Sequence, residues 1–182
     1  MLPPPVAPRS VTAVISKGCT LSLSYEQKQW DRLGRDAVIV GLDEAGRGPL
    51  AGPVVAAAVA ILDAPSGEID AIIEGVRDSK LIVDEEERER LHDSIVTNKR
   101  LVVGVATLDQ NIIDEVNILR AAMRAMDEAL NDLTKKLPTG RYPTFAYIDG
   151  PIVPSGIESA VRAGVIRGGC EAVIRGDGKV GV

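Results

Sequence analysis

The spacing of apolar and polar residues divides the chain into short strands and helices. Compact apolar runs bounded by glycine, proline or charged residues are typical of buried strands. Four such runs lie at 37–42, 54–62, 101–106 and 144–148, and a weaker fifth strand is predicted at 172–175. The order of elements, with hairpins first and a crossover later, indicates an α/β or α+β architecture.

Helical periodicity fills the intervals between these strands. A capping-box pattern opens a short helix at 25–33, and Asp84 caps a second helix of about four turns. Apolar residues three and four positions apart, including Leu119, predict one long helix at 112–135. A short helix or turn follows at 157–163.

Residues 1–23 differ from the rest of the chain. They contain four prolines and no acidic residue, and we interpret them as a disordered or targeting extension of one domain at 24–182. A frayed terminus and an organellar transit peptide both have this composition. We expect a cytoplasmic protein, or a mitochondrial or plastid one if the extension is a transit peptide.

The composition excludes several classes of function. The 182 residues include 21 basic and 26 acidic side chains, and this net charge of −5 excludes a basic nucleic-acid coat over the whole chain. Aromatic residues make up 3% and histidine occurs once, which argues against a base-stacking platform and a histidine-rich metal site. Two distant cysteines indicate a reducing compartment. No apolar run approaches the ~20 residues that span a bilayer, so we expect no membrane partner.

Acidic residues end two of the predicted strands. Asp43 and Glu44 follow the first strand, and Asp149 follows the fourth. Ligands of α/β sheets gather at the carboxyl ends of strands, so parallel neighbouring strands would bring Asp43 and Asp149 together. Converging carboxylates usually need a metal ion, and oxygen ligands suit Mg²⁺ or Mn²⁺. Such a site would carry out two-metal hydrolysis of a phosphodiester.

Two points bear on this interpretation. Polar residues also end strands without any catalytic role. In addition, adjacent residues of a strand point to opposite faces, so Asp43 and Glu44 share a site only if the strand ends or twists between them. The turn that follows favours such a change, because Gly46 and Gly48 flank Arg47 there. Glycines allow close approach to a ligand, and the guanidinium complements phosphate.

The run of residues 43–59, DEAGRGPLAGPVVAAAV, closely resembles the opening motif of bacterial-type ribonuclease HII. Shorter similarities follow in the same order, and together they cover roughly residues 25–179. They are Asp78-Ser79-Lys80, Asn117-Ile118-Leu119, Ala125-Met126, Tyr147-Ile148-Asp149-Gly150 and Gly176-Asp177-Gly178-Lys179.

The resemblance implies an RNase H-like fold, with a mixed central sheet flanked by helices. It implies a monomeric endoribonuclease that depends on Mg²⁺ or Mn²⁺. The expected substrates are RNA–DNA hybrid duplexes and DNA that contains ribonucleotides. The expected processes are DNA replication and ribonucleotide excision repair.

The resemblance also assigns roles to individual residues. The implied catalytic residues are also the metal ligands, namely Asp43, Glu44 and Asp149. The implied substrate-binding residues are Gly46, Arg47, Gly48, Ser79, Lys80 and Lys179. The first three would read the ribose 2′-OH, which distinguishes RNA from DNA. Lys179 would contact a phosphate, whereas turn formation and helix capping are the alternative roles of Ser79 and Lys80.

The family continues beyond the motif that ends at Lys179. A long Ser- and Ala-rich helix carries a fourth acidic metal ligand there, and a later tyrosine packs on the nucleotide beside the cut. This sequence has three residues after Lys179, so we expect a domain truncated at its C-terminus, without the C-terminal helical part. The sheet face around Val38, Val40, Val173 and Ile174 would then lose its cover.

The sequence supports three hypotheses of function. The first is a ribonuclease HII-like endonuclease. The second is a catalytically inactive truncated fragment, or a module that binds hybrid duplex without cutting it. The third is another Mg²⁺-dependent phosphoryl-transfer enzyme that shares the acids at the strand ends.

Overall fold

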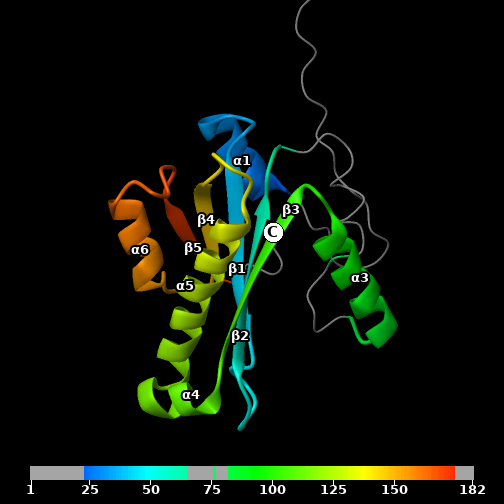
Figure 1. Ribbon diagram of the computed structural model, residues 1–182, viewed down its shortest axis with the longest axis vertical. Helices are drawn as coiled ribbons and strands as arrows, with labels where there is room; N and C mark the ends of the chain where they lie inside the picture. Colours follow the sequence, from blue (N-terminus) through cyan, green and yellow to red (C-terminus); the bar gives the residue numbers. More distant parts are fainter. Residues whose placement is uncertain (1–22, 65–75, 77–81, 175–182) are drawn as a thin grey trace, which may run out of the picture.

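A mixed sheet of five strands forms the centre of the computed structural model, which describes residues 23–64, 76 and 82–174 (Figure 1). The strands are β1 (Val38–Ala45), β2 (Val54–Ile61), β3 (Leu101–Leu108), β4 (Pro143–Asp149) and β5 (Cys170–Val173). Their order across the sheet is β3-β2-β1-β4-β5. The pairs β1–β2 and β2–β3 are antiparallel, whereas β1–β4 and β4–β5 are parallel. The expected hairpins and later crossover are therefore confirmed.

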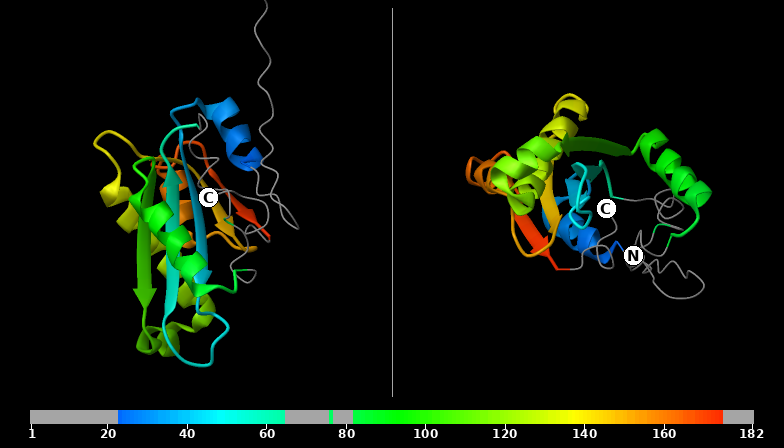
Figure 2. Two further views of the ribbon diagram at one scale, coloured as in Figure 1. Left: turned by 90° about the vertical axis from the view of Figure 1, so that its right-hand side faces the viewer. Right: turned by 90° about the horizontal axis from the view of Figure 1, so that it is seen from below.

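Helices lie on both faces of this sheet (Figure 2). They are α1 (Ser24–Leu33), α3 (Glu85–Thr97), α4 (Gln110–Val116), α5 (Ile118–Lys136) and α6 (Ser155–Arg162). On one face, α5 packs across β1, β2 and β3. On the other face, Trp30 of α1 is buried with Ile39 and Phe145 of the sheet.

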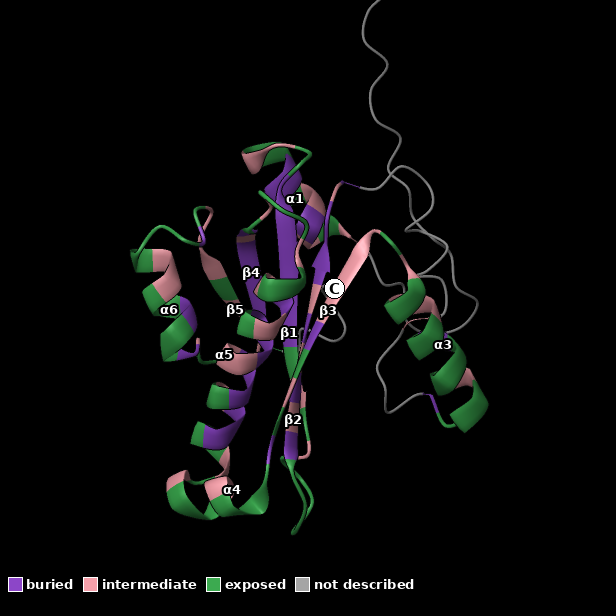
Figure 3. Cartoon of the chain, viewed as in Figure 1, coloured by how far each residue is buried: buried purple, intermediate pink, exposed green. Residues whose placement is uncertain are grey.

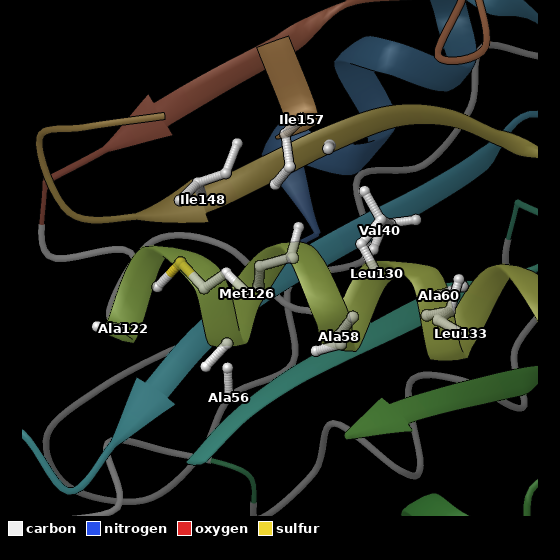
Figure 4. Packing of buried hydrophobic residues seen from close by; sticks show 14 of the residues in the cluster. Val40, Ala56, Ala58, Ala60, Ala122, Met126, Leu130, Leu133, Ile148 and Ile157 are labelled. Atoms are coloured by element: carbon white, nitrogen blue, oxygen red, sulfur yellow. The ribbon is translucent and has the colours of Figure 1, made fainter. Parts of the chain in front are cut away.

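The face covered by α5 is packed with small and aliphatic side chains. Buried positions of α5 recur three or four residues apart, and β2 presents alternate alanines to them. Figure 4 shows this contact, formed by Ala122, Met126, Leu130 and Leu133 of α5 and by Val40, Ile148, Ala56, Ala58 and Ala60 of the strands. The small side chains of β2 let the helix lie close to the sheet, and removing apolar surface from water stabilises the contact.

The single long helix predicted at 112–135 is wrong, because the structure has α4 and α5 with a break at Asn117. Asn117 has a φ of 74°, in the left-handed region, which ends the first helical run. Its side-chain oxygen then accepts the N–H of Arg120 at 3.1 Å and caps α5. Asparagine tolerates this conformation better than most residues, so no glycine or proline marks the break in the sequence. Leu119, which the helical spacing counts among the apolar positions of the predicted long helix, is 39% exposed.

Most strand ends also differ from the prediction by one to three residues, as β1 and β5 illustrate. β1 runs to Ala45 rather than to residue 42, because its ladder with β2 continues to the pair Ala45–Val55. β5 spans 170–173 rather than 172–175, since its ladder with β4 begins at Cys170. The predictions that these segments are strands are correct, whereas the end residue of each strand depends on its partner strand.

The residues expected to lose their cover do not share one face of the sheet, and β1, which carries two of them, is largely buried (Figure 3). Val38 and Val40 are buried in the cluster beneath α5. Val173 is buried in the second cluster, with residues of α1. Only Ile174 of these four residues is exposed, at 63%. The expectation was wrong for the first three, because α5 and α1 supply the cover.

Candidate active site

The parallel pairing of β1 and β4 brings two of the predicted acids to one edge of the sheet. Leu42 lies opposite Ile148, so the next residues along the two strands are Asp43 and Asp149. Asp149 is also paired with Val173 of β5 on its other side. The two strands are thus parallel neighbours, and both acids stand at their carboxyl ends.

Strand alternation places Asp43 and Asp149 on the same face of the sheet. Ile39 lies four residues before Asp43, and Tyr147 lies two residues before Asp149. Both are buried in the cluster beneath α1. Residues an even number of positions apart share a face, so the two aspartates project from the α1 face.

Glu44 is not brought to this face. β1 remains paired with β2 through Glu44, which lies opposite Ala56, so the strand neither ends nor turns after Asp43. Ala56 is buried beneath α5, and alternation directs Glu44 to that side as well. The Glu44 side chain is 11% exposed, and its carboxylate forms an ion pair with the Arg47 guanidinium at 2.8 Å. Across the described residues, no three His, Cys, Asp or Glu side chains gather as a metal-binding group.

The glycine-rich turn forms the loop between β1 and β2. Gly46 has a φ of 97°, and a Cβ there would lie 2.4 Å from the carbonyl oxygen of Pro53, so the base of the loop requires glycine. A Cβ at Gly48 would meet no atom within 4 Å, so this part of the loop faces open space. Arg47 between them is exposed. The loop therefore offers backbone groups and one guanidinium to a ligand.

The remaining predicted substrate contacts, Ser79, Lys80 and Lys179, lie outside the described residues. Most of the N-terminal extension also lies outside them, so its interpretation stays a prediction. In the ranges that are described, no helix is long and apolar enough to cross a membrane.

The chemistry of the two aspartates suits a hard divalent cation. They offer only carboxylate oxygens, which are the ligands that Mg²⁺ and Mn²⁺ prefer. Neighbouring carboxylates repel each other, and a cation between them removes the repulsion. The chain after Asp149 is also fixed, because Gly150 has a φ of 108° and donates its N–H to the Val173 carbonyl at 3.1 Å.

A buried polar network on the α1 face includes Tyr147, which lies two residues before Asp149. The Tyr147 hydroxyl donates to the Tyr25 carbonyl at 2.9 Å and accepts the side-chain N–H of Gln29 at 2.8 Å. Burial raises the pKa of Tyr147 to about 12, although the hydrogen bond from Gln29 acts in the opposite direction. No local sequence pattern predicts this pairing, because Gln29 and Tyr147 are 118 residues apart.

A cavity of about 550 Å³ lies at the opposite end of the same strands. Its charged lining residues are Asp36, Arg141 and Arg167. Arg141 is already engaged by Asp63, with 3.2 Å between the guanidinium and the carboxylate. The cavity lies where β1 and β4 begin, so it is not part of the carboxylate edge.

Comparison with known proteins adds the family to this geometry. The family model described as Ribonuclease HII matches residues 40–166, which include both aspartates and the glycine-rich loop. The chain belongs to the ribonuclease HII family. Ribonuclease HII of Ruegeria pomeroyi is 42% identical over 141 residues, or 78% of this chain and 50% of the relative. That of Aquifex aeolicus is 49% identical over 111 residues, or 61% of this chain and 51% of the relative.

The matched region is a smaller share of other relatives. Ribonuclease HII of Ruminiclostridium cellulolyticum is 54% identical over 95 residues, or 52% of this chain and 34% of the relative. The chain thus spans about a third to a half of the curated ribonuclease HII relatives that it matches.

Solved structures agree with an RNase H-like fold. Ribonuclease H2 from Pyrococcus horikoshii OT3 has a TM-score of 0.59 at 26% identity and covers 79% of this chain and 65% of its own. Bst-RNase HIII in complex with Mn²⁺ has a TM-score of 0.58 at 22% identity, over 78% of this chain and 46% of its own. The second likeness concerns the fold alone.

Proposed function

We propose that this chain carries the catalytic edge of an endoribonuclease that cuts the RNA strand of RNA–DNA hybrids and incises DNA at embedded ribonucleotides. The observation that carries the proposal is the β1–β4 register, which sets Asp43 beside Asp149 on one face of the sheet. Membership of the ribonuclease HII family supports the substrate class. Cytoplasmic DNA replication and ribonucleotide excision repair are the corresponding processes, with an organelle as the alternative compartment.

In this proposal, Asp43 and Asp149 hold Mg²⁺ or Mn²⁺ through their carboxylate oxygens. Two bound ions would lower the pKa of the attacking water and stabilise the leaving oxygen. The protein fixes the aspartates by pairing β1 with β2 and β4, and β4 with β5. Glu44 becomes the third ligand only when its ion pair with Arg47 opens and β1 also leaves its ladder with β2 after Asp43, because that ladder keeps Glu44 on the other face.

The loop between β1 and β2 reads the substrate in this proposal. Gly46 and Gly48 let the sugar–phosphate backbone approach, and their N–H groups and Arg47 bind the ribose 2′-OH and the adjoining phosphate. Engagement of Arg47 by the substrate would also break its ion pair with Glu44. Ser79, Lys80 and Lys179 add contacts to the nucleic acid, and the chain acts as a monomer.

A hybrid-binding module that does not cut is the second candidate. Its support is that Glu44 lies on the face opposite to the two aspartates and is paired with Arg47. Such a module would keep the affinity of the loop for hybrid duplex without assembling the three acids.

One experiment separates these candidates. The wild-type chain and the variants Asp43→Asn and Asp93→Asn are incubated with a duplex that contains one ribonucleotide and with the all-DNA duplex, in Mg²⁺ or Mn²⁺. Asp93 is an exposed acid of α3, so its variant is the matched control. We expect cutting at the ribonucleotide by the wild type and by Asp93→Asn. Asp43→Asn should lose about a hundredfold or more of the rate while it still binds.

The other outcomes are also decisive. Binding without cutting by the wild type supports the second candidate. Full activity of Asp43→Asn contradicts the metal mechanism, and a wild type that neither binds nor cuts contradicts both candidates.

A further inference from the structure

β3 forms one edge of the sheet, and its own sequence contains little that would oppose pairing with another strand. Its eight residues, LVVGVATL, are mostly apolar and rich in β-branched side chains, a composition that favours pairing with another strand. Edge strands are commonly protected by charges, prolines or bulges. Neither a charge nor a proline occurs in Leu101–Leu108, and its register with β2 has no bulge.

Alternate residues of β3 direct their backbone groups away from β2. In an antiparallel pair, the N–H and C=O of one residue face the same side. The N–H of Val105 and the C=O of Val103 bond to side chains of α5 rather than to β2, so these residues face outward. An incoming strand would need these same groups.

Two side chains of α5 occupy the outward groups. The Asp132 carboxylate accepts the N–H of Val105 at 3.0 Å, and the Lys136 ammonium donates to the C=O of Val103 at 3.1 Å. Lys136 and Asp132 also pair with each other at 2.6 Å. We call these three contacts the edge clamp.

Gly104 allows α5 to come close enough for the edge clamp to form. A Cβ on Gly104 would lie 2.3 Å from the carbonyl oxygen of Ala129 and 2.4 Å from the backbone nitrogen of Leu133. The helix backbone therefore rests directly on the strand. Asp132 and Lys136 are four residues apart, so they share one side of the helix, and both reach the edge.

The edge clamp acts on specificity more than on stability. Its side chains are 35% exposed at Asp132 and 51% exposed at Lys136, and ion pairs in such positions add little to the free energy of unfolding. Without the clamp, water would satisfy the same backbone groups. The pKa of Asp132 is lowered by the hydrogen bonds from Lys136 and Val105, so the carboxylate stays ionised at neutral pH.

We propose that the outer edge of β3 is a self-pairing surface, and that Asp132 and Lys136 of α5 hold it closed. Without the edge clamp, β3 of a second copy pairs antiparallel with this edge, and the two sheets join. A second copy fits because it supplies the same apolar, β-branched strand, and antiparallel pairing of identical strands gives a closed two-fold contact.

The test compares self-association of the wild type with that of the double variant Asp132→Ala/Lys136→Ala by sedimentation equilibrium. The double variant should associate about tenfold or more tightly, the effect of one or two backbone hydrogen bonds. Glu128→Ala is the matched control, because the Arg124–Glu128 pair has the same spacing on α5 and both partners are exposed. Its mass should equal that of the wild type at every concentration.

A further variant identifies the surface that is used. Adding Val105→Lys to the double variant should restore the wild-type mass, because a charge on an edge strand opposes pairing. Association that Val105→Lys does not reverse overturns the proposal, and so does a double variant with the wild-type mass. If the double variant does not fold, Lys136→Ala alone should still associate more tightly than the wild type, and its failure to do so overturns the proposal.

Discussion

Tyr147 and Asp149 share one strand and one face, yet their surroundings differ. Tyr147 is 2% exposed and its hydroxyl bonds to α1, whereas Asp149 lies at the partly exposed strand end. Buried hydroxyl groups require partners, because an unmet hydrogen bond in the interior costs free energy. Tyr25 also contacts the Tyr147 ring edge-on, with 5.6 Å between centroids. The network therefore fastens α1 to the strand that carries Asp149.

Tyr147→Phe should lower the free energy of unfolding by about 1–3 kcal/mol near neutral pH, because Gln29 and the Tyr25 carbonyl lose their partner. The pKa of Tyr147 is raised from 10.0 to about 12 in the folded chain, so the folded state keeps this proton while the unfolded chain loses it. The stability from Tyr147 is thus present below pH 10 and falls as the pH rises toward 12. Urea unfolding across this range should show the two proteins converging. A difference that stays constant would contradict the role of the hydroxyl.

At the scale of elements, α5 organises both the sheet and the helix that follows β4. It meets β3 at Gly104, as described for the edge clamp. A side chain of α5 also caps the N-terminus of α6, because the Asp127 carboxylate accepts the N–H groups of Gly156 and Ile157 at 3.1 and 2.9 Å. Burial raises the pKa of Asp127, although both hydrogen bonds act to lower it. One helix thus fixes elements on two sides.

Gly104→Ala should destabilise the chain by about 1–3 kcal/mol or more, because the added methyl overlaps backbone atoms of α5 that cannot rotate away. Gly48→Ala is the control, since a Cβ there meets nothing within 4 Å. Thermal unfolding should therefore leave Gly48→Ala close to the wild type. Equal melting temperatures for Gly104→Ala and the wild type would show that α5 does not rest on β3.

At the scale of the whole molecule, the candidate site depends on strands that are distant in sequence. The parallel β1–β4 pairing brings Asp43 and Asp149 together, and α5 covers the reverse side of that junction. A cation bound by both aspartates would link the two halves of the folded chain but not of the unfolded chain. Metal binding should therefore appear as added stability.

Mn²⁺ at about a hundred times its dissociation constant should add about 2.7 kcal/mol to the free energy of unfolding. For a domain of this size, that corresponds to a melting temperature several degrees higher. Asp149→Asn should remove most of this rise, and excess EDTA should return the wild type to its metal-free melting temperature. A rise of equal size in Asp149→Asn would place the ion elsewhere.

The sequence by itself determined the local elements and the family. Compact apolar runs identified the strands, and the helical period identified most helices, because these patterns reflect which parts of each element are buried. The acids at the strand ends were identified from their places after apolar runs, and the run from Asp43 through the glycine-rich loop indicated the family. The helix break at Asn117 was not predicted, since asparagine ends a helix without the glycine or proline that usually marks such a break.

The tertiary structure alone decided how these parts meet. The β1–β4 register pairs residues more than a hundred positions apart, so it follows from the crossover and from α5 packing rather than from local pattern. That register set Asp43 beside Asp149. The continued ladder with β2 kept Glu44 on the other face. The edge clamp of Asp132 and Lys136 is likewise invisible in the sequence, because its partners are backbone atoms of β3, which local side-chain patterns do not specify.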